Sequence, residues 1–186
     1  MKKLFPVLFF TLCIYQSLPA QHKLALHSIN LVGLQNGSSG SSLSLQSIAS
    51  VSVKHSFAGI GAGLDLYKLR SIPLFVDLRQ ELGGKKRNLF LYGDVGYNLP
   101  WLTDEQKNLQ QQFNNDNMKA SLYYDAGFGY QIRFQRDILL LSAGYSYKEL
   151  KNRVGEYACP VMGCGVVEQT YRYRMPRIVV KAGWRF

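Results

Sequence analysis

The sequence has few of the residues from which enzymes and metal sites are built. It contains three cysteines and three histidines in 186 residues, and no histidine follows His55. His27 and His55 are each followed by serine, but neighbours in a strand point to opposite faces, so neither dipeptide forms a catalytic pair. Cys159 and Cys164 have no nearby histidine to complete a metal ligand set. We therefore expect no enzymatic activity, no catalytic residues, no metal and no cofactor.

Long apolar runs are also absent beyond the first residues, which excludes transmembrane helices there, and no solenoid repeat or heptad is present. The beginning itself is typical of an export signal. Lys2 and Lys3 precede an apolar run at residues 4–14, and small and apolar residues lead to Ala20. That run is too short to cross a bilayer, which needs roughly 20 residues. We expect cleavage after Ala20, a signal peptide at residues 1–20 and one domain at residues 21–186.

The net charge of the chain is strongly positive, with or without the expected signal peptide. The whole chain carries a formal charge of +10, of which the two lysines of the signal contribute two, leaving +8. The basic residues are scattered among apparent strands, and an exported protein meets little nucleic acid, so we expect no nucleic-acid partner. Anionic lipid head groups are the expected partners of this charge.

A period of two dominates the rest of the sequence. Apolar residues alternate with small or polar ones over stretches of about ten residues, as tilted transmembrane strands require. Residues 119–134 show the pattern best, and residues 43–53, 58–66, 72–82, 89–99, 137–148 and 177–186 repeat it. A first strand near residues 23–34 alternates poorly. The pattern predicts an all-β protein, an eight-stranded antiparallel up-and-down β-barrel.

Connection lengths agree with this strand count, because outer-membrane barrels pair short periplasmic turns with longer external loops. The even connections, near residues 55–57, 83–88 and 135–137, are short. The odd connections should be external, near residues 35–42, 68–71, 100–118 and 152–170. Residues 100–118 form either a short amphipathic helix or a polar loop. Both ends of the mature chain should then be periplasmic.

Alternation alone does not say which face is inside, because a soluble lipocalin-like barrel alternates too. Here the polar face is rich in Gly and Ser with opposed charges, which suits the narrow interior of an eight-stranded barrel. Aromatic residues lie near the strand ends on the apolar face, as at membrane interfaces. We therefore place these charges in the lumen, mainly as structural filling: Lys54, Asp65, Asp77, Arg79, Glu81, Asp94, Asp125, Arg133, Lys181 and Arg185.

The export signal, the alternating strands and the ending Ala182-Gly183-Trp184-Arg185-Phe186 together resemble the small OmpA/OmpX-type outer-membrane barrels. The resemblance covers roughly residues 21–186 and implies an outer-membrane location. It also implies that Phe186, following Trp184 on the same face, belongs to the signal read by the barrel-assembly machinery. Such barrels serve as structural proteins, adhesins and occasionally lipid-modifying enzymes, so the resemblance specifies architecture more than activity.

The sequence favours a structural or interaction role, exerted through external loops on a partner that it does not identify. The alternatives are a narrow ion or small-solute channel and, third, a secreted lipocalin-like ligand-binding barrel. We expect a monomer in contact with outer-membrane lipid. In an oxidising compartment Cys159 and Cys164 should form a disulfide. Pro176 lies inside the last strand and predicts a bulge that turns Tyr171 and Tyr173 outward while Arg172 and Arg174 face the lumen or its mouth.

Overall fold

A computed structural model describes residues 24–83, 88–101, 117–135, 137–158 and 165–186. The expected signal peptide, residues 102–116 of the expected connection at 100–118, and both Cys159 and Cys164 lie outside the described residues. The strands are β1 (Ala25–Gly37), β2 (Gly40–Val53), β3 (Ser56–Asp65), β4 (Ser71–Leu82), β5 (Leu89–Pro100), β6 (Asn117–Lys119), β7 (Ser121–Arg133), β8 (Ile138–Ala158) and β9 (Gly165–Arg185).

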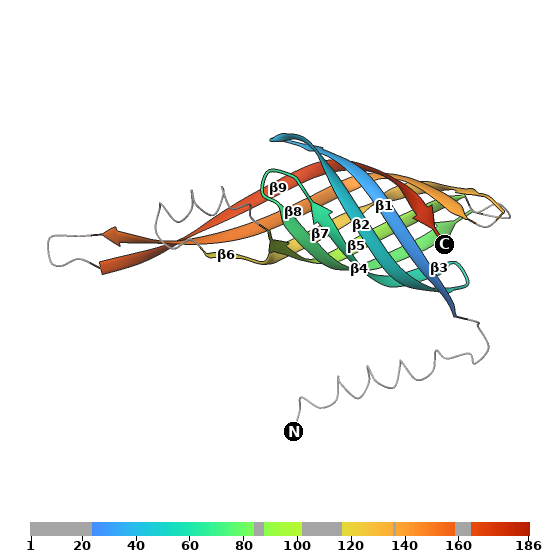
Figure 1. Ribbon diagram of the computed structural model, residues 1–186, viewed down its shortest axis with the longest axis horizontal. Coiled ribbons are helices and arrows are strands. Elements are labelled where there is room, and N and C mark those ends of the chain that lie inside the picture. The colour runs from blue at the N-terminus through green and yellow to red at the C-terminus, as the bar shows by residue number, and fades with distance from the viewer. Residues whose placement is uncertain (1–23, 84–87, 102–116, 136, 159–164) are drawn as a thin grey trace, which may run out of the picture.

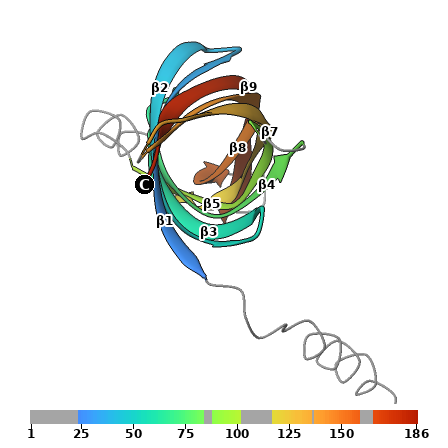
Figure 2. The ribbon, with the colours of Figure 1, turned by 90° about the vertical axis from the view of Figure 1, so that its right-hand side faces the viewer.

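The strands form one closed antiparallel ring. Each main strand pairs with the next along the chain, and β9 pairs with both β8 and β1, which closes the sheet (Figure 2). The short β6 directly precedes β7 and pairs with β8 as β7 does. Together β6 and β7 therefore occupy one strand position of the ring. The predicted eight-stranded antiparallel barrel is therefore confirmed. No helix in the described part of the chain is long and apolar enough to cross a membrane.

The two ends of the barrel differ. One end, here called the terminal end, carries the start of β1 and the end of β9, together with the turns after β2, β4 and β7. The opposite end, the loop end, carries the connections after β1, β3, β5 and β8. At the loop end β8 and β9 continue as a two-stranded ribbon well past the other strands (Figure 1).

Side chains alternate across the wall as the sequence predicts. The outer face exposes an apolar surface that includes Val76, Val95, Phe128, Ile178 and Val180, each more than half exposed. The inner face holds buried charges but also apolar side chains, most of which the alternation does not predict there. Ile29, Leu31, Ile48, Phe75, Phe90, Tyr92, Tyr123 and Leu140 form one buried cluster in the lumen.

Glycines on the inner face make room for the large rings of this cluster. A Cβ atom on Gly61 would collide with the ring of Phe75, and one on Gly129 would collide with the ring of Phe90. Gly93 lies on the outer face, where a Cβ atom would meet nothing within 4 Å. The glycine-rich polar face is therefore the complement of bulky residues on neighbouring strands, as close packing of a narrow barrel requires.

Two expectations about connections were wrong. Residues 35–42 are not an open loop, because β1 reaches Gly37 and β2 begins at Gly40, leaving a tight turn at Ser38 and Ser39. Residues 152–170 are largely strand, since the β8–β9 ladder runs to the pair Ala158 and Gly165. In both places polar residues typical of loops are held by cross-strand pairing.

The predicted bulge at Pro176 is also wrong. The β8–β9 ladder passes regularly through the pair Tyr147 and Pro176, and Met175 and Arg177 both point inward. On its other side β9 has already lost its partner, because β1 ends at Gly37 opposite Arg177. Pro176 thus lies where β9 becomes an edge strand, a position that tolerates the missing N–H. Face parity does not reset, so Arg172 and Arg174 stay on the outer face, not in the lumen or its mouth. Tyr171 and Tyr173 are exposed because the ribbon leaves the barrel.

Candidate functional site: the charged lumen

The buried charges of the lumen fall into three tiers along the barrel axis. The tier at the loop end centres on Asp65, at the end of β3. Arg177 and Lys148 both form ion pairs with Asp65, with the Lys148 Nζ at 3.2 Å. Arg177 also donates to the Ser146 hydroxyl at 2.9 Å. Neither basic residue was among the predicted lumen charges, although both lie on the polar face of their strands.

This tier holds the β3–β4 connection in the mouth of the barrel, where its Tyr67 side chain forms what is here called the Tyr67 plug. Tyr67, in the β3–β4 connection, is only 1% exposed. Lys148 donates to the carbonyl oxygens of Tyr67 and Leu69 at 3.1 and 2.6 Å. Leu150 and Met175, from the base of the ribbon, pack with Tyr67 in a second apolar cluster. The connection is thereby held across the loop end of the lumen.

The phenol of Tyr67 is itself tied to the β1–β2 turn. Its oxygen accepts a hydrogen bond from the Ser39 backbone N–H at 2.7 Å. Burial acts to raise the pKa of this phenol, but hydrogen bonds from Ser39 and Ser38 and the charge of Arg177 outweigh it and lower the pKa below its ordinary value. The Arg177 guanidinium lies 5.3 Å from the Tyr67 ring centroid, in the range of a cation–π contact.

The middle tier is a row of three carboxylates on adjacent strands. Asp77 of β4 lies opposite Asp94 of β5, which lies opposite Asp125 of β7. Like charges in such positions repel, so the row needs compensation. Lys181 supplies a positive charge to two of these carboxylates: its Nζ lies 2.8 Å from an oxygen of Asp125 and 3.5 Å from an oxygen of Asp94. Arg79 forms an ion pair with Asp77 at 2.9 Å.

Aromatic hydroxyls complete this tier. Tyr92 and Tyr123 donate to the two oxygens of Asp125 at 2.9 and 3.3 Å. The Lys181 ammonium lies 4.7 Å from the centroid of the Tyr92 ring. A cavity beside Tyr123, between this tier and Asp65, has a volume of about 10 Å³, about the space of one water molecule. The side chains of this tier are thus buried in the interior of the barrel and pack against one another there.

The tier at the terminal end centres on Glu81. Its carboxylate accepts from Arg185 at 3.0 Å and from Arg133 at 3.2 Å. Arg185 is buried and also donates to Gln131, whereas Arg133 is 44% exposed and lies at the barrel mouth. Lys54 does not join the lumen charges: it occupies the β2–β3 turn with a φ of 58° and an exposed side chain. The strand ends at Val53, one residue before alternation would have turned Lys54 inward.

The C-terminal residues close the ring at this end. Phe186 exchanges backbone hydrogen bonds with Ser28, donating at 2.9 Å and accepting at 3.2 Å. The side chains of Trp184 and Phe186 are 49% and 60% exposed on the outer face. Both residues predicted as an assembly signal thus present their rings outside the barrel.

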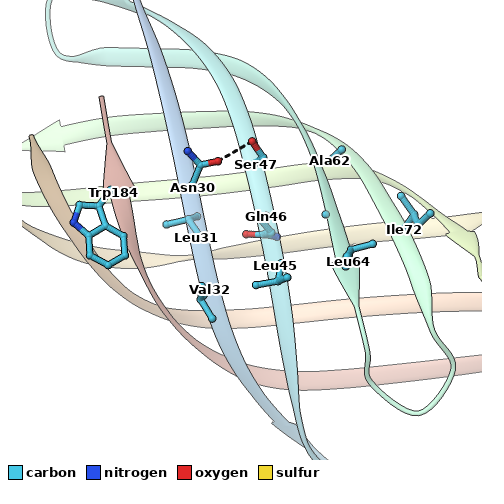
Figure 3. Close-up of a pocket in the computed structure, with 11 residues that line it drawn as sticks. Asn30, Leu31, Val32, Leu45, Gln46, Ser47, Ala62, Leu64, Ile72 and Trp184 are labelled. Carbon is cyan, nitrogen blue, oxygen red and sulfur yellow. Dashed lines mark hydrogen bonds between the residues drawn. The ribbon is translucent and has the colours of Figure 1, made fainter.

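The outer wall carries a broad apolar groove across β9, β1, β2, β3 and β4, of about 560 Å³ (Figure 3). Trp184, Val32, Leu45, Leu64 and Ile72 line it. Its polar side chains bind one another: the Ser47 hydroxyl donates to the Asn30 side-chain oxygen at 2.9 Å. Internal pairing of polar groups is what a wall facing hydrocarbon requires.

Comparison with solved structures bears on this architecture. The outer membrane protein AlkL, determined by solid-state NMR in DMPC lipid bilayers, matches with a TM-score of 0.51 at 10% identity, over 91% of this chain and 93% of AlkL. The fold is that of a small transmembrane barrel. A de novo designed transmembrane β-barrel matches 89% of this chain and 100% of its own, with a TM-score of 0.48 and 10% identity. The outer membrane protein OprG from Pseudomonas aeruginosa matches over 89% of this chain and 97% of OprG, with a TM-score of 0.41 and 15% identity.

At the level of sequence, no family model matches the chain, and no curated protein matches it. Among the described residues, no group of three or more His, Cys, Asp or Glu side chains could hold a metal ion.

Proposed function

We propose that this chain is an outer-membrane barrel of a Gram-negative envelope that acts as a scaffold and displays the β8–β9 ribbon outside the cell. The observation that supports this proposal is the contrast between the packed lumen and the long β8–β9 extension. The lumen is filled by paired charges and rings, while β8 and β9 extend as 21-residue strands beyond the barrel. Side chains just fill the interior of an eight-stranded barrel, whereas wide aqueous channels take about sixteen strands. The packed lumen therefore favours a role in display over a role in conduction.

The proposed placement has the loop end outside and both ends of the mature chain in the periplasm, after removal of residues 1–20. Outer-membrane lipid and the barrel-assembly machinery are the implied partners, the latter through Trp184 and Phe186. The partner of the ribbon is a further component that the geometry does not identify. We propose a monomer with no nucleic-acid partner, no cofactor and no enzymatic activity.

Conductance in planar bilayers tests the scaffold role. We expect the purified, folded protein to give no discrete current steps, because the three tiers block the axis. Reproducible steps would contradict the scaffold role and favour the second candidate, a narrow ion or small-solute channel. The observation that favours this alternative is the presence of five buried or mouth-lining carboxylates facing basic groups. In a channel, Tyr67→Gly should raise the conductance by removing the plug at the mouth.

We also propose a disulfide between Cys159 and Cys164, in the connection at the end of the ribbon. Closing so short a ring stabilises by only about 2 kcal/mol on the entropy model, so its effect should be confined to the ribbon. Mass spectrometry of the non-reduced protein tests it: the bond removes two hydrogens. Alkylation of both cysteines without prior reduction would refute it.

A further inference from the structure

The outer face of β7, β8 and β9 changes character in ordered steps toward the loop end. Its apolar part includes Phe128, Val180 and Ile178, which are 65%, 57% and 67% exposed. One step further, Tyr124 lies opposite Tyr147, and their rings stack with centroids 4.9 Å apart. Both rings are half-buried, and Tyr145, one step toward the apolar part, is 45% exposed. Aromatic residues on the outer face mark the boundary between hydrocarbon and head groups. The residues beyond Tyr147 are therefore at head-group height.

At that height three basic residues stand in a row on adjacent strands. Lys119 of β6 lies opposite Lys151 of β8, which lies opposite Arg172 of β9. Directly opposed residues share one face of the sheet, with Cβ atoms about 5 Å apart. Arg174 lies on the same face, one step toward the membrane, opposite Glu149. Lys119, Arg172 and Arg174 are exposed, and Lys151 is 38% exposed.

A shift in register brings Lys119 into this row. The β7–β8 pairing and the β6–β8 pairing differ by one residue, so a bulge lies between Lys119 and Ser121. Ser121 is buried and lies opposite the buried Asn98, so simple alternation from this position would have placed Lys119 inside the barrel. The bulge instead turns it to the outer face beside Lys151.

The only described carboxylate on this patch is already engaged. Glu149 accepts hydrogen bonds from Ser121 at 3.1 Å and Tyr147 at 3.3 Å, and Lys151 lies 3.6 Å from it. Within the described side chains, Lys119, Arg172 and Arg174 form no salt bridge within 4 Å. The charges of Lys151 and Arg172 both act on Glu149, which lies opposite Arg174, so one carboxylate compensates part of a patch of four basic residues. Like charges directly opposite each other destabilise a sheet, so an external anion would stabilise the remaining positive charge.

We propose that Lys119, Lys151, Arg172 and Arg174 form a binding site for the phosphate groups of a lipid in the surrounding leaflet. The patch continues the lipid-facing wall without interruption, so a lipid whose chains pack on Ile178 and Val180 presents its head group to it. Arginine and lysine are the side chains suited to phosphate, arginine through two parallel hydrogen bonds. With the loop end outside, as the proposed function has it, this lipid is the phosphorylated glycolipid of the outer leaflet.

The test is binding of lipid A to the purified, folded full chain in a zwitterionic detergent, followed by native mass spectrometry. We expect diphosphorylated lipid A to bind at least about tenfold tighter than its dephosphorylated form. Lys151→Gln/Arg172→Gln should lose about tenfold in affinity for the phosphorylated form. Lys54→Gln/Lys68→Gln, which removes two exposed charges from turns elsewhere, should bind as the wild type does.

Two controls separate loss of binding from loss of folding. The charge-conserving variant Lys151→Arg/Arg172→Lys should retain binding. Heat-modifiable gel migration should show that every variant is folded. Equal affinity of the wild type and Lys151→Gln/Arg172→Gln for lipid A would overturn the site. Inorganic phosphate binding as tightly as lipid A would overturn its assignment to a lipid. Because the assay needs only the folded barrel, its failure is distinct from a failure of the proposed placement in the cell.

Discussion

At the scale of single residues, alternation predicts which side chains enter the lumen but not how they pair. Asp77, Asp94 and Asp125 are on the polar face by parity, yet only the register shows that they lie opposite one another. Lys54 shows the limit of parity, since the strand ends before it. Phe75 was missed because it interrupts a polar face, and Ile29 because the first strand alternates poorly.

Lys181 is the residue on which the middle tier depends most. In Lys181→Met, Asp94 and Asp125 lose their common counter-charge inside the barrel. Breaking a buried pair in this way costs about 3–5 kcal/mol. We expect urea unfolding from lipid vesicles to show a loss of this size. Lys54→Met, at an exposed turn, should change stability by less than about 0.5 kcal/mol. Equal effects of the two substitutions would contradict the structural role of the tier.

At the scale of elements, the alternation predicted the strands with a clean period, such as β4 and β7, nearly to their ends. It missed the ribbon because polar and charged residues beyond Lys148 do not alternate with apolar ones. The ribbon is held by the β8–β9 ladder instead, and a ladder of backbone hydrogen bonds is not visible in side-chain character.

The ribbon should be dispensable for the barrel. Replacing residues 153–170 with Asn-Gly joins Asn152 to its partner Tyr171 through a two-residue turn. We expect this variant to insert and to keep its heat-modifiable gel shift. The larger replacement of residues 148–175 also removes Lys148, Leu150 and Met175, and should destabilise the barrel by releasing the Tyr67 plug. Failure of the shorter excision to insert would show that the ribbon is part of the fold.

Phe186, directly after β9, should matter for assembly more than for stability. Phe186→Asp is expected to reduce insertion strongly while leaving export intact. Phe134→Asp is the matched control, because Phe134 is equally exposed, at 60%, near the same end of the barrel. Quantified membrane fractions compare the two. Normal membrane levels of Phe186→Asp would rule out the assembly role.

At the scale of the whole molecule, the barrel combines an apolar outer wall, a lumen of paired charges and, toward the loop end, the basic patch of Lys119, Lys151, Arg172 and Arg174. The sequence predicted the barrel because a lipid-facing wall imposes alternation on every strand. The basic patch was not predicted, because Lys119 reaches it through a bulge that breaks the alternation. The ribbon is not embedded in the wall, so the alternation that predicts the fold says nothing of what the ribbon does.

The central claim, a barrel spanning the outer membrane with its loop end outside, is tested most directly by labelling single cysteines in intact cells. In a Cys13→Ser/Cys159→Ser/Cys164→Ser background, Lys68→Cys reports the loop end and Lys54→Cys the terminal end, both at exposed turns. A membrane-impermeant maleimide should label Lys68→Cys in intact cells and Lys54→Cys only after the outer membrane is disrupted. Labelling of Lys54→Cys alone, or of both variants, in intact cells would contradict the account.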